Sequence, residues 1–136
     1  MPTYNATYIQ QLDTGTPIEG ATPPSEINDA IREIKVCLKN QYSVTTKTSN
    51  YNITNSDGII LGNTINNSIT LTLPTAVGIS GKIYTIKKIH ANNTLTVNTS
   101  LSQTIDGASN LSWTTNNRSY TLVSNGSAWL IIGYKP

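Results

Sequence analysis

The sequence is poor in the side chains that most enzymes use for chemistry. It contains one cysteine and one histidine, and charged residues make up 12% of its 136 positions, about half of the roughly 25% that is usual in globular proteins. A single cysteine, Cys37, excludes a disulfide within the chain, and we interpret it as a small packing residue with no base beside it. We therefore expect no enzymatic activity, no cofactor and no metal site.

The chain also lacks a strong charge of either sign and any long hydrophobic run. Nine basic and seven acidic residues leave a net charge of +2, which is too weak a field to indicate binding to nucleic acid or anionic lipid. The longest apolar run, Trp129 to Ile132, is far shorter than the roughly 18 residues of a membrane span. No charged segment followed by an apolar one opens the sequence, so we expect no Sec-type export. We expect neither nucleic acid nor a membrane among its partners.

What the sequence does contain is a series of short alternating segments between about Ser49 and Tyr134, of which Ser68–Leu73 is the clearest. Alternation of apolar and polar residues, interrupted by Gly, Asn, Ser and Pro, is typical of half-buried antiparallel strands. The sequence therefore predicts a mainly β fold, with an antiparallel β-sandwich or jelly-roll-like domain over residues 43–136. Strands are expected at Tyr51–Ile53, Ile59–Leu61, Ile69–Leu73, Lys82–Ile89, Leu95–Asn98, Gln103–Ile105, Leu111–Thr114, Tyr120–Ser124 and Trp129–Gly133.

The last two of these strands form the firmest local prediction. Asn125-Gly126 lies between Tyr120–Ser124 and Trp129–Gly133, and Asn-Gly supplies the positive φ angles that tight hairpin turns require. We expect an antiparallel hairpin there, with its register fixed by the turn.

The ionisable residues of the β region are interpreted as surface and turn residues. On an alternating strand Lys82 and Lys88 share a face, and we expect that face to be solvated. His90 precedes Ala-Asn-Asn, and Asp57 and Asp106 each precede a glycine, so turn formation explains all three better than catalysis does.

Residues 25–42 carry the pattern of an amphipathic helix. Ser25 is a suitable N-cap, acidic residues lie near the predicted start and lysines near the end. Four aliphatic residues with four-three-four spacing form one stripe along it: Ile27, Ile31, Ile34 and Leu38. Isoleucine at such positions favours coiled coils of three or four strands over dimers. The stripe is thus a candidate trimer interface, and the alternative is that it packs against the chain's own sheet.

Residues 1–24 are rich in Pro, Gly, Thr and Tyr, and their prolines disfavour helix. We interpret this segment as an extended attachment arm, with a disordered tail as the alternative. Its candidate anchors on a neighbouring surface are Tyr4, Tyr8, Ile9, Leu12 and Ile18.

Several segments resemble a β module found in bacteriophage virion proteins. They are Ile-Thr-Leu-Thr-Leu-Pro at 69–74, Gly-Lys-Ile-Tyr-Thr-Ile-Lys-Lys-Ile at 81–89, Leu-Thr-Val at 95–97, Thr-Ile-Asp-Gly at 104–107 and Tyr-Thr-Leu-Val-Ser-Asn-Gly-Ser-Ala-Trp at 120–129. The stretch Pro-Ser-Glu-Ile-Asn-Asp-Ala-Ile-Arg-Glu-Ile-Lys at 24–35 is similar to the helix that precedes fibre modules in phage appendages. The resemblance implies a structural protein of the virion, usually a homotrimer, attached through its N-terminal part with the β domain facing outward.

Length helps to choose among virion roles, because a tail fibre needs a long shaft. An arm, one helix and one β module suit a homotrimeric capsid cement or decoration protein, or a short head fibre. Its arm would staple neighbouring subunits of the major capsid protein, since an extended segment buries much area per residue and three arms bind multivalently.

The alternative is a tail-fibre or receptor-binding tip that contacts host carbohydrate or protein, and only this alternative requires a host receptor. Carbohydrate binding needs an exposed aromatic ring next to amide side chains. Trp113 with Asn116 and Asn117 is the candidate patch, whereas a tryptophan buried in the core is the simpler interpretation of Trp113.

Overall fold

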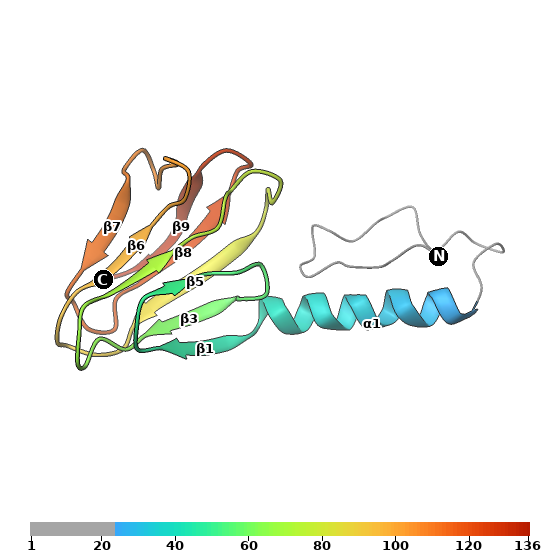
Figure 1. The fold of residues 1–136 in the computed structure, drawn as a ribbon, viewed down its shortest axis with the longest axis horizontal. Helices are drawn as coiled ribbons and strands as arrows, with labels where there is room; N and C mark the ends of the chain where they lie inside the picture. The colour runs from blue at the N-terminus through green and yellow to red at the C-terminus, as the bar shows by residue number, and fades with distance from the viewer. Residues whose placement is uncertain (1–23) are drawn as a thin grey trace.

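A β domain and a projecting helix make up the part of the chain that the structure describes (Figure 1). The computed structural model describes residues 24–136, with side chains from residue 28 onward. The predicted arm, with Tyr4, Tyr8, Ile9, Leu12 and Ile18, lies outside the described residues. The elements in order are α1 (Pro24–Gln41), β1 (Val44–Lys47), β2 (Tyr51–Asn52), β3 (Ile59–Gly62), β4 (Ile69–Thr72), β5 (Ile83–Lys88), β6 (Leu95–Asn98), β7 (Asn110–Trp113), β8 (Ser119–Ser124) and β9 (Trp129–Lys135).

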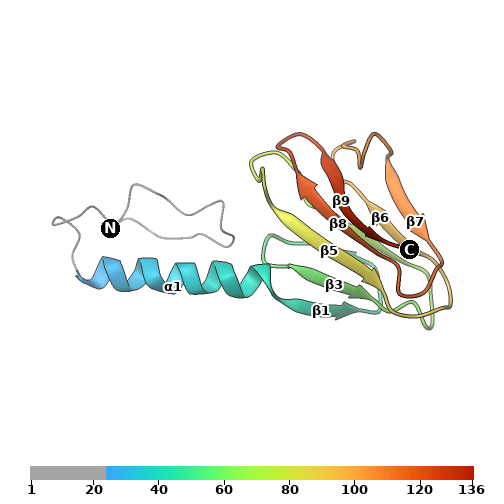
Figure 2. The ribbon, with the colours of Figure 1, turned by 180° about the vertical axis from the view of Figure 1, so that it is seen from behind.

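The strands form two sheets, and the chain crosses from one to the other after nearly every strand. One sheet has the order β1-β3-β5-β8-β9 and the other β2-β4-β6-β7. Strands β1, β3 and β5 are parallel neighbours, as are β2, β4 and β6, whereas β7, β8 and β9 pair antiparallel. The first six strands therefore make three stacked coils of a flattened spiral, and the last three complete the two sheets. Figure 2 views the molecule from the side of the five-stranded sheet.

The mainly β prediction is confirmed, but the sheets are mixed, and the prediction of an antiparallel jelly-roll-like sandwich is not. Parallel neighbours usually need a helical crossover. Here the connecting strand lies in the opposite sheet, so the return path itself adds a strand and no helix is needed. Strand β1 was not predicted from the sequence, and the predicted strand at Gln103–Ile105 is reduced to isolated bridges made by Ile105.

The core lies between the sheets, where the alternation directs aliphatic and aromatic side chains inward. In β5 every second residue is buried, and Tyr84 and Ile86 are fully enclosed. Tyr84 packs against Trp129 with ring centroids 5.4 Å apart, and Trp129 is also fully buried. The sandwich is therefore held by one continuous apolar core.

The predicted hairpin is confirmed by strands β8 and β9. Asn125 Oδ1 accepts hydrogen bonds from the backbone N–H groups of Ser127 and Ala128 at 2.9 and 2.8 Å, and Gly126 has φ of 92°. The side chain of Asn125 thus closes the turn, and glycine supplies the left-handed backbone that the turn requires.

The helix is confirmed over Pro24–Gln41 and joins the sandwich almost without a loop. Ser43 Oγ donates to the backbone oxygens of Asn40 and Ser56 at 2.9 and 3.3 Å, and Ser43 O accepts from Ile59 N at 2.7 Å. Gly58 lies directly beneath the helix end, where a Cβ would stand 2.4 Å from Gln41 O. The absence of a side chain at residue 58 therefore allows this close junction.

Replacing Gly58 with alanine is expected to lower the free energy of unfolding by about 1–3 kcal/mol, because the new methyl group must displace backbone atoms. Urea unfolding followed by tryptophan fluorescence measures the loss. Gly133→Ala is the control, since its Cβ would meet the Thr121 side chain at 3.2 Å and no backbone. Equal losses in the two variants would contradict the proposed steric role of Gly58.

Candidate functional site

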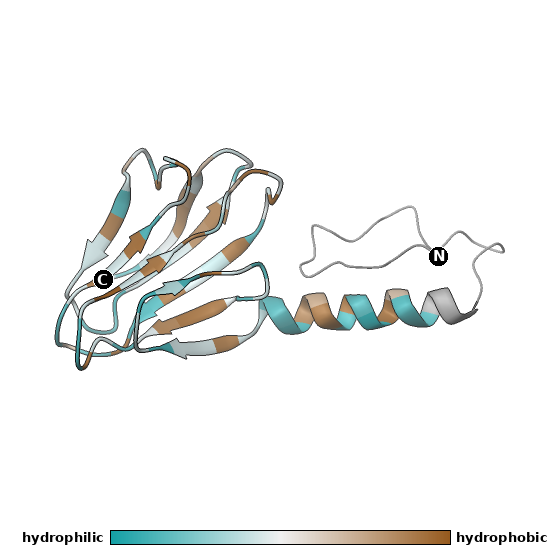
Figure 3. Cartoon of the chain, in the orientation of Figure 1, coloured by the Kyte–Doolittle hydropathy of each residue, from teal (hydrophilic) through white to brown (hydrophobic). Residues whose placement is uncertain are grey.

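The predicted helix stripe is uncovered within the single chain. Ile31 and Ile34 are each 44% exposed and Leu38 is 42% exposed, while the side chain of Ile27 lies outside the described residues. The helix projects away from both sheets along the long axis of the molecule (Figures 1 and 2), and apolar bands recur along it (Figure 3). The alternative that this stripe packs on the chain's own sheet is therefore wrong for the three described residues.

The predicted ligand patch at Trp113 is not formed. Trp113 is 4% exposed and packs edge-on against Tyr120, with ring centroids 4.9 Å apart. Asn116 and Asn117 lie exposed in the turn between β7 and β8, without an exposed indole ring beside them. The structure thus confirms the interpretation of Trp113 as a core residue.

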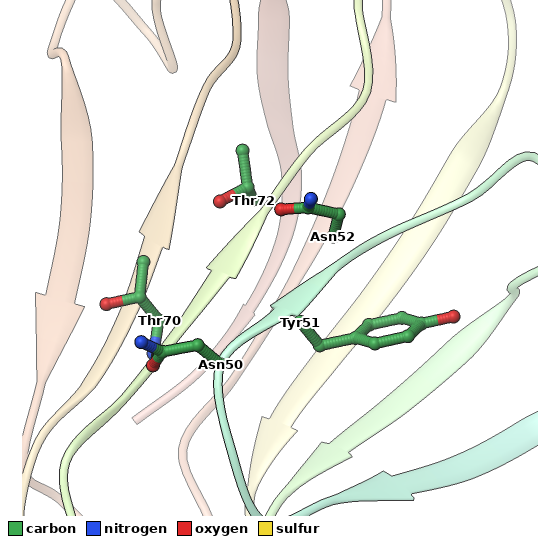
Figure 4. Close-up of a pocket in the computed structure, with 5 residues that line it drawn as sticks. All are labelled: Asn50, Tyr51, Asn52, Thr70 and Thr72. Carbon is green, nitrogen blue, oxygen red and sulfur yellow. The ribbon is translucent and has the colours of Figure 1, made fainter.

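A shallow polar groove lies elsewhere, on the outer face of the four-stranded sheet (Figure 4). It encloses about 350 Å³ and is lined by Asn50, Tyr51, Asn52, Thr70 and Thr72. Asn50 Oδ1 accepts from Thr70 N at 2.8 Å, and the Tyr51 ring points away from the two threonines. The groove presents neutral hydroxyl and amide groups, which can hydrogen-bond a neutral polar ligand.

The same neutral chemistry continues across the neighbouring strands. Asn52, Thr72, Asn98 and Asn110 are direct neighbours in the strand register, and so are Thr70, Thr96 and Ser112. Thr96 and Ser112 share a hydrogen bond of 2.9 Å between their hydroxyls. The sequence does not reveal this surface, because each strand contributes only one or two outward polar residues. Their alignment depends on which strands pair and in which register.

The prediction that Lys82 and Lys88 lie on a solvated strand face is wrong. They are 3% and 0% exposed, because Lys88 in β5 and Lys82 directly before it point inward with the same alternation as Tyr84 and Ile86. A buried ammonium group must be paired or hydrogen-bonded, and both lysines reach backbone carbonyl oxygens near the ends of the sandwich.

Each buried lysine holds a turn. Lys82 Nζ donates to the backbone oxygens of Asn55 and Asp57 at 3.0 and 2.9 Å, and Lys88 Nζ donates to those of His90 and Asn92. Burial lowers the pKa of both amines, and for Lys82 the nearby charge of Asp57 opposes that shift. The two amines thus act as structural clamps.

Replacing Lys88 with methionine is expected to cost about 1–3 kcal/mol at neutral pH, because two buried carbonyls lose their donor. Since the folded-state pKa of Lys88 is lowered, the unfolded state binds more protons between that pKa and the ordinary value of 10.5. The wild-type stability should therefore rise relative to the variant as pH increases through that window. Urea unfolding of both proteins at several alkaline pH values measures the difference, and a gap that shrinks with pH would contradict the assignment.

Three further ionisable residues of the β domain, Asp57, His90 and Asp106, serve turns, as the sequence predicts. Asp57 Oδ2 accepts from Tyr51 Oη at 3.1 Å and from Thr54 N at 2.8 Å. His90 Nδ1 accepts from Asn92 N at 3.2 Å. Asp106 has a left-handed φ of 47°, and its carboxylate accepts from Ile131 N at 3.2 Å. These contacts account for all three residues structurally.

Cys37 lies on the helix and is fully buried. Burial raises the pKa of its thiol, with a smaller contribution in the same direction from the charge of Glu33. A thiol that is enclosed and protonated at neutral pH is a poor nucleophile, so Cys37 is a packing residue at the base of the helix.

Comparison with known proteins gives no assignment: no family model matches the sequence, and no curated protein matches it significantly. Within residues 24–136, no three His, Cys, Asp or Glu side chains gather where they could hold a metal ion. No helix in this range combines the length and the apolar character that a membrane span requires.

Proposed function

We propose that this chain is a structural protein of a bacteriophage virion, a homotrimeric capsid cement or decoration protein or a short head fibre. The resemblance of its β segments and helix to phage appendage modules supports this role. The observation that carries the proposal is the projecting helix, whose stripe of Ile31, Ile34 and Leu38 is uncovered in the single chain. Burying such a stripe requires another molecule, and three copies of the same helix can bury it against each other.

The β domain has the rigidity that we expect of a domain displayed on the surface of a particle. Its parallel coils, single core and lysine clamps hold every strand to its neighbours, and the short junction at Ser43 ties the block to the helix. A trimer of helices would therefore fix the positions of three β domains relative to each other. Such an assembly is mechanically rigid, as a protein that decorates and strengthens a capsid needs to be.

We assign the attachment function to residues 1–23, which precede the helix. An arm of this length on each of three chains could grip neighbouring subunits of the capsid, and linked binding events raise the overall affinity well above that of one arm. In this arrangement the β domains face outward and the arms hold the shell together.

Deletion of residues 1–23 tests the attachment role. We expect the shortened chain to remain folded and trimeric but to lose binding to particles that lack the protein, measured by co-sedimentation with those particles. The full chain, added at the same concentration, is the control and should sediment with them. Equal binding by the shortened chain would rule out the arm as the attachment element.

The second candidate function is a tail-fibre or receptor-binding tip that contacts host carbohydrate or protein. The observation that favours it is the neutral groove at Asn52, Thr70 and Thr72, whose hydroxyl and amide groups match those of a sugar. A glycan array separates the two functions, because binding that is lost in a Thr70→Val, Thr72→Val variant would support the receptor role. Binding to no glycan, together with binding to capsids, would support the cement role.

A further inference from the structure

The outer face of the five-stranded sheet carries aliphatic side chains that the single chain leaves at least partly exposed. In β3 and β5 every second residue is buried, and in β8 Leu122 and Ser124 are buried; the residues between them point outward. Six outward positions carry aliphatic side chains, namely Val44, Ile59, Leu61, Ile83, Val123 and Leu130, and the remaining ones are mainly Thr, Ser and Lys. We call these six residues the aliphatic face. None of them is buried, and Val44 and Leu130 are 58% and 38% exposed.

The strand register places these residues in two groups, one on β1 and β3 and the other on β5, β8 and β9. Val44 is paired with Ile59, while Ile83 is opposite Val123 and Val123 is opposite Leu130. Side chains directly opposite each other on neighbouring strands lie on the same side of the sheet and in contact range. Ile59 and Ile83 line the same hollow and so connect the two groups, while Leu61 lies farther along β3, opposite Lys87. The aliphatic face thus reaches from edge strand β1 to edge strand β9.

The outer face of the other sheet has the opposite character. Its register rows consist of Asn, Thr and Ser, as in the row of Asn52, Thr72, Asn98 and Asn110. In the single chain both outer faces are turned toward water and away from the common core. Packing within the chain therefore does not explain why one face is aliphatic and the other polar. A large exposed apolar patch on one side marks a surface that another molecule covers.

The position of the helix indicates that the covering molecule is a second copy of this chain. Gln41 at the end of α1 and the adjoining Tyr42 line a hollow of about 160 Å³ together with Gly58, Ile59, Ile83 and Thr85. The aliphatic face therefore begins where the helix ends. If the stripe of one helix packs against the same stripe of its neighbours, the faces at the ends of those helices are brought together as well.

The charge on this face agrees with contact between copies. Among the described outward positions of the sheet, Lys87 and Lys135 carry the charge, and both lie in one register row with Ser119 and Leu61. The other five residues of the aliphatic face lie outside that row. The aliphatic residues themselves form a neutral area, which offers no charge pattern for selecting a charged partner. A neutral apolar surface next to a self-associating helix suits burial in a ring of identical subunits.

We propose that the aliphatic face is a contact surface between copies of this chain, continuous with the helix stripe. The inference rests on the proposed trimeric function and extends it from the helix to the β domain. In this arrangement the three five-stranded sheets turn toward the threefold axis, and the polar faces of the four-stranded sheets remain toward solvent.

Reactivity of single cysteines tests the inference in the full chain. In a Cys37→Ala background, Val123→Cys places a thiol on the aliphatic face and Thr96→Cys places one on the polar face. Both positions are partly exposed in the single chain, so they are matched. Maleimide labelling is then timed on protein whose mass has been measured by light scattering, and circular dichroism checks that each variant is folded.

We expect the trimer to label at residue 123 at least about tenfold more slowly than at residue 96, because an enclosed thiol is protected from the reagent. Protection should disappear when Ile34→Asp and Leu38→Asp are added to give the monomer. Leu130→Cys, at the edge strand, provides a second site should Val123→Cys impair folding. A trimer with equal labelling at both positions would overturn the inference, because the aliphatic face would then not lie between copies of the chain. A different protein would have to cover the face, and the proposed function would be unaffected. A monomeric wild-type chain would overturn both.

Discussion

Replacing Ile34 and Leu38 together with aspartate is expected to convert the proposed trimer to a monomer. In the proposed trimer these substitutions place six carboxylates around one axis, away from water, where like charges repel strongly. In the single chain both positions are more than 40% exposed. The free energy of unfolding of the single chain should therefore change by less than about 0.5 kcal/mol per site. Size-exclusion chromatography with light scattering measures the mass, and circular dichroism measures the fold.

Val36→Asp is the matched control for this result. Val36 is 45% exposed, but it lies two positions from both Ile34 and Leu38 and therefore on the opposite side of the helix. We expect this variant to keep the wild-type mass. Dissociation by Val36→Asp to the same extent as by the double variant would show that the effect is general to the helix and does not come from the stripe.

Replacing Trp129 with alanine is expected to cost about 3–5 kcal/mol of the free energy of unfolding. Trp129 is fully buried, its ring packs against Tyr84, and its Nε1 donates to Pro74 O at 3.3 Å. Since small domains have a total stability of about 5–15 kcal/mol, this loss would leave the β domain marginal. Urea unfolding followed by circular dichroism at one fixed protein concentration measures it, because association contributes to apparent stability.

Trp129→Phe separates ring packing from the hydrogen bond. It keeps an aromatic ring near Tyr84 but removes the donor to Pro74, and we expect a clearly smaller loss than for alanine. A loss below about 1 kcal/mol in the alanine variant would contradict the central place of Trp129 in the core.

The helix and the β8–β9 hairpin could be predicted because their signals are local. Apolar spacing over about three turns identifies the helix, and Asn125-Gly126 between two alternating segments identifies the hairpin. Strand positions were also largely predictable, since alternation and turn residues mark each one. The exposure of Ile31, Ile34 and Leu38 was anticipated only as one of two alternatives, because spacing reveals a stripe but not what covers it.

The parallel pairing and the burial of Lys82 and Lys88 could not be predicted in the same way. A strand that pairs with a parallel neighbour shows the same alternation as one in a hairpin, so pairing depends on long-range packing. The two lysines follow the inward alternation of β5, but their charge suggested the outside. Their burial depends on backbone carbonyl oxygens that accept from the ammonium groups, in a distant turn for Lys82 and in the turn directly after β5 for Lys88. The aliphatic face could not be predicted for a related reason, because its residues come from five strands whose pairing is not apparent in the sequence.

The mass of the wild-type chain in solution tests the central claim most directly, namely that the uncovered apolar stripe of the helix is buried by two further copies of the chain. Light scattering across a dilution series at micromolar concentration should give three times the chain mass of 14.7 kDa. A mass of 14.7 kDa at every concentration would contradict the account.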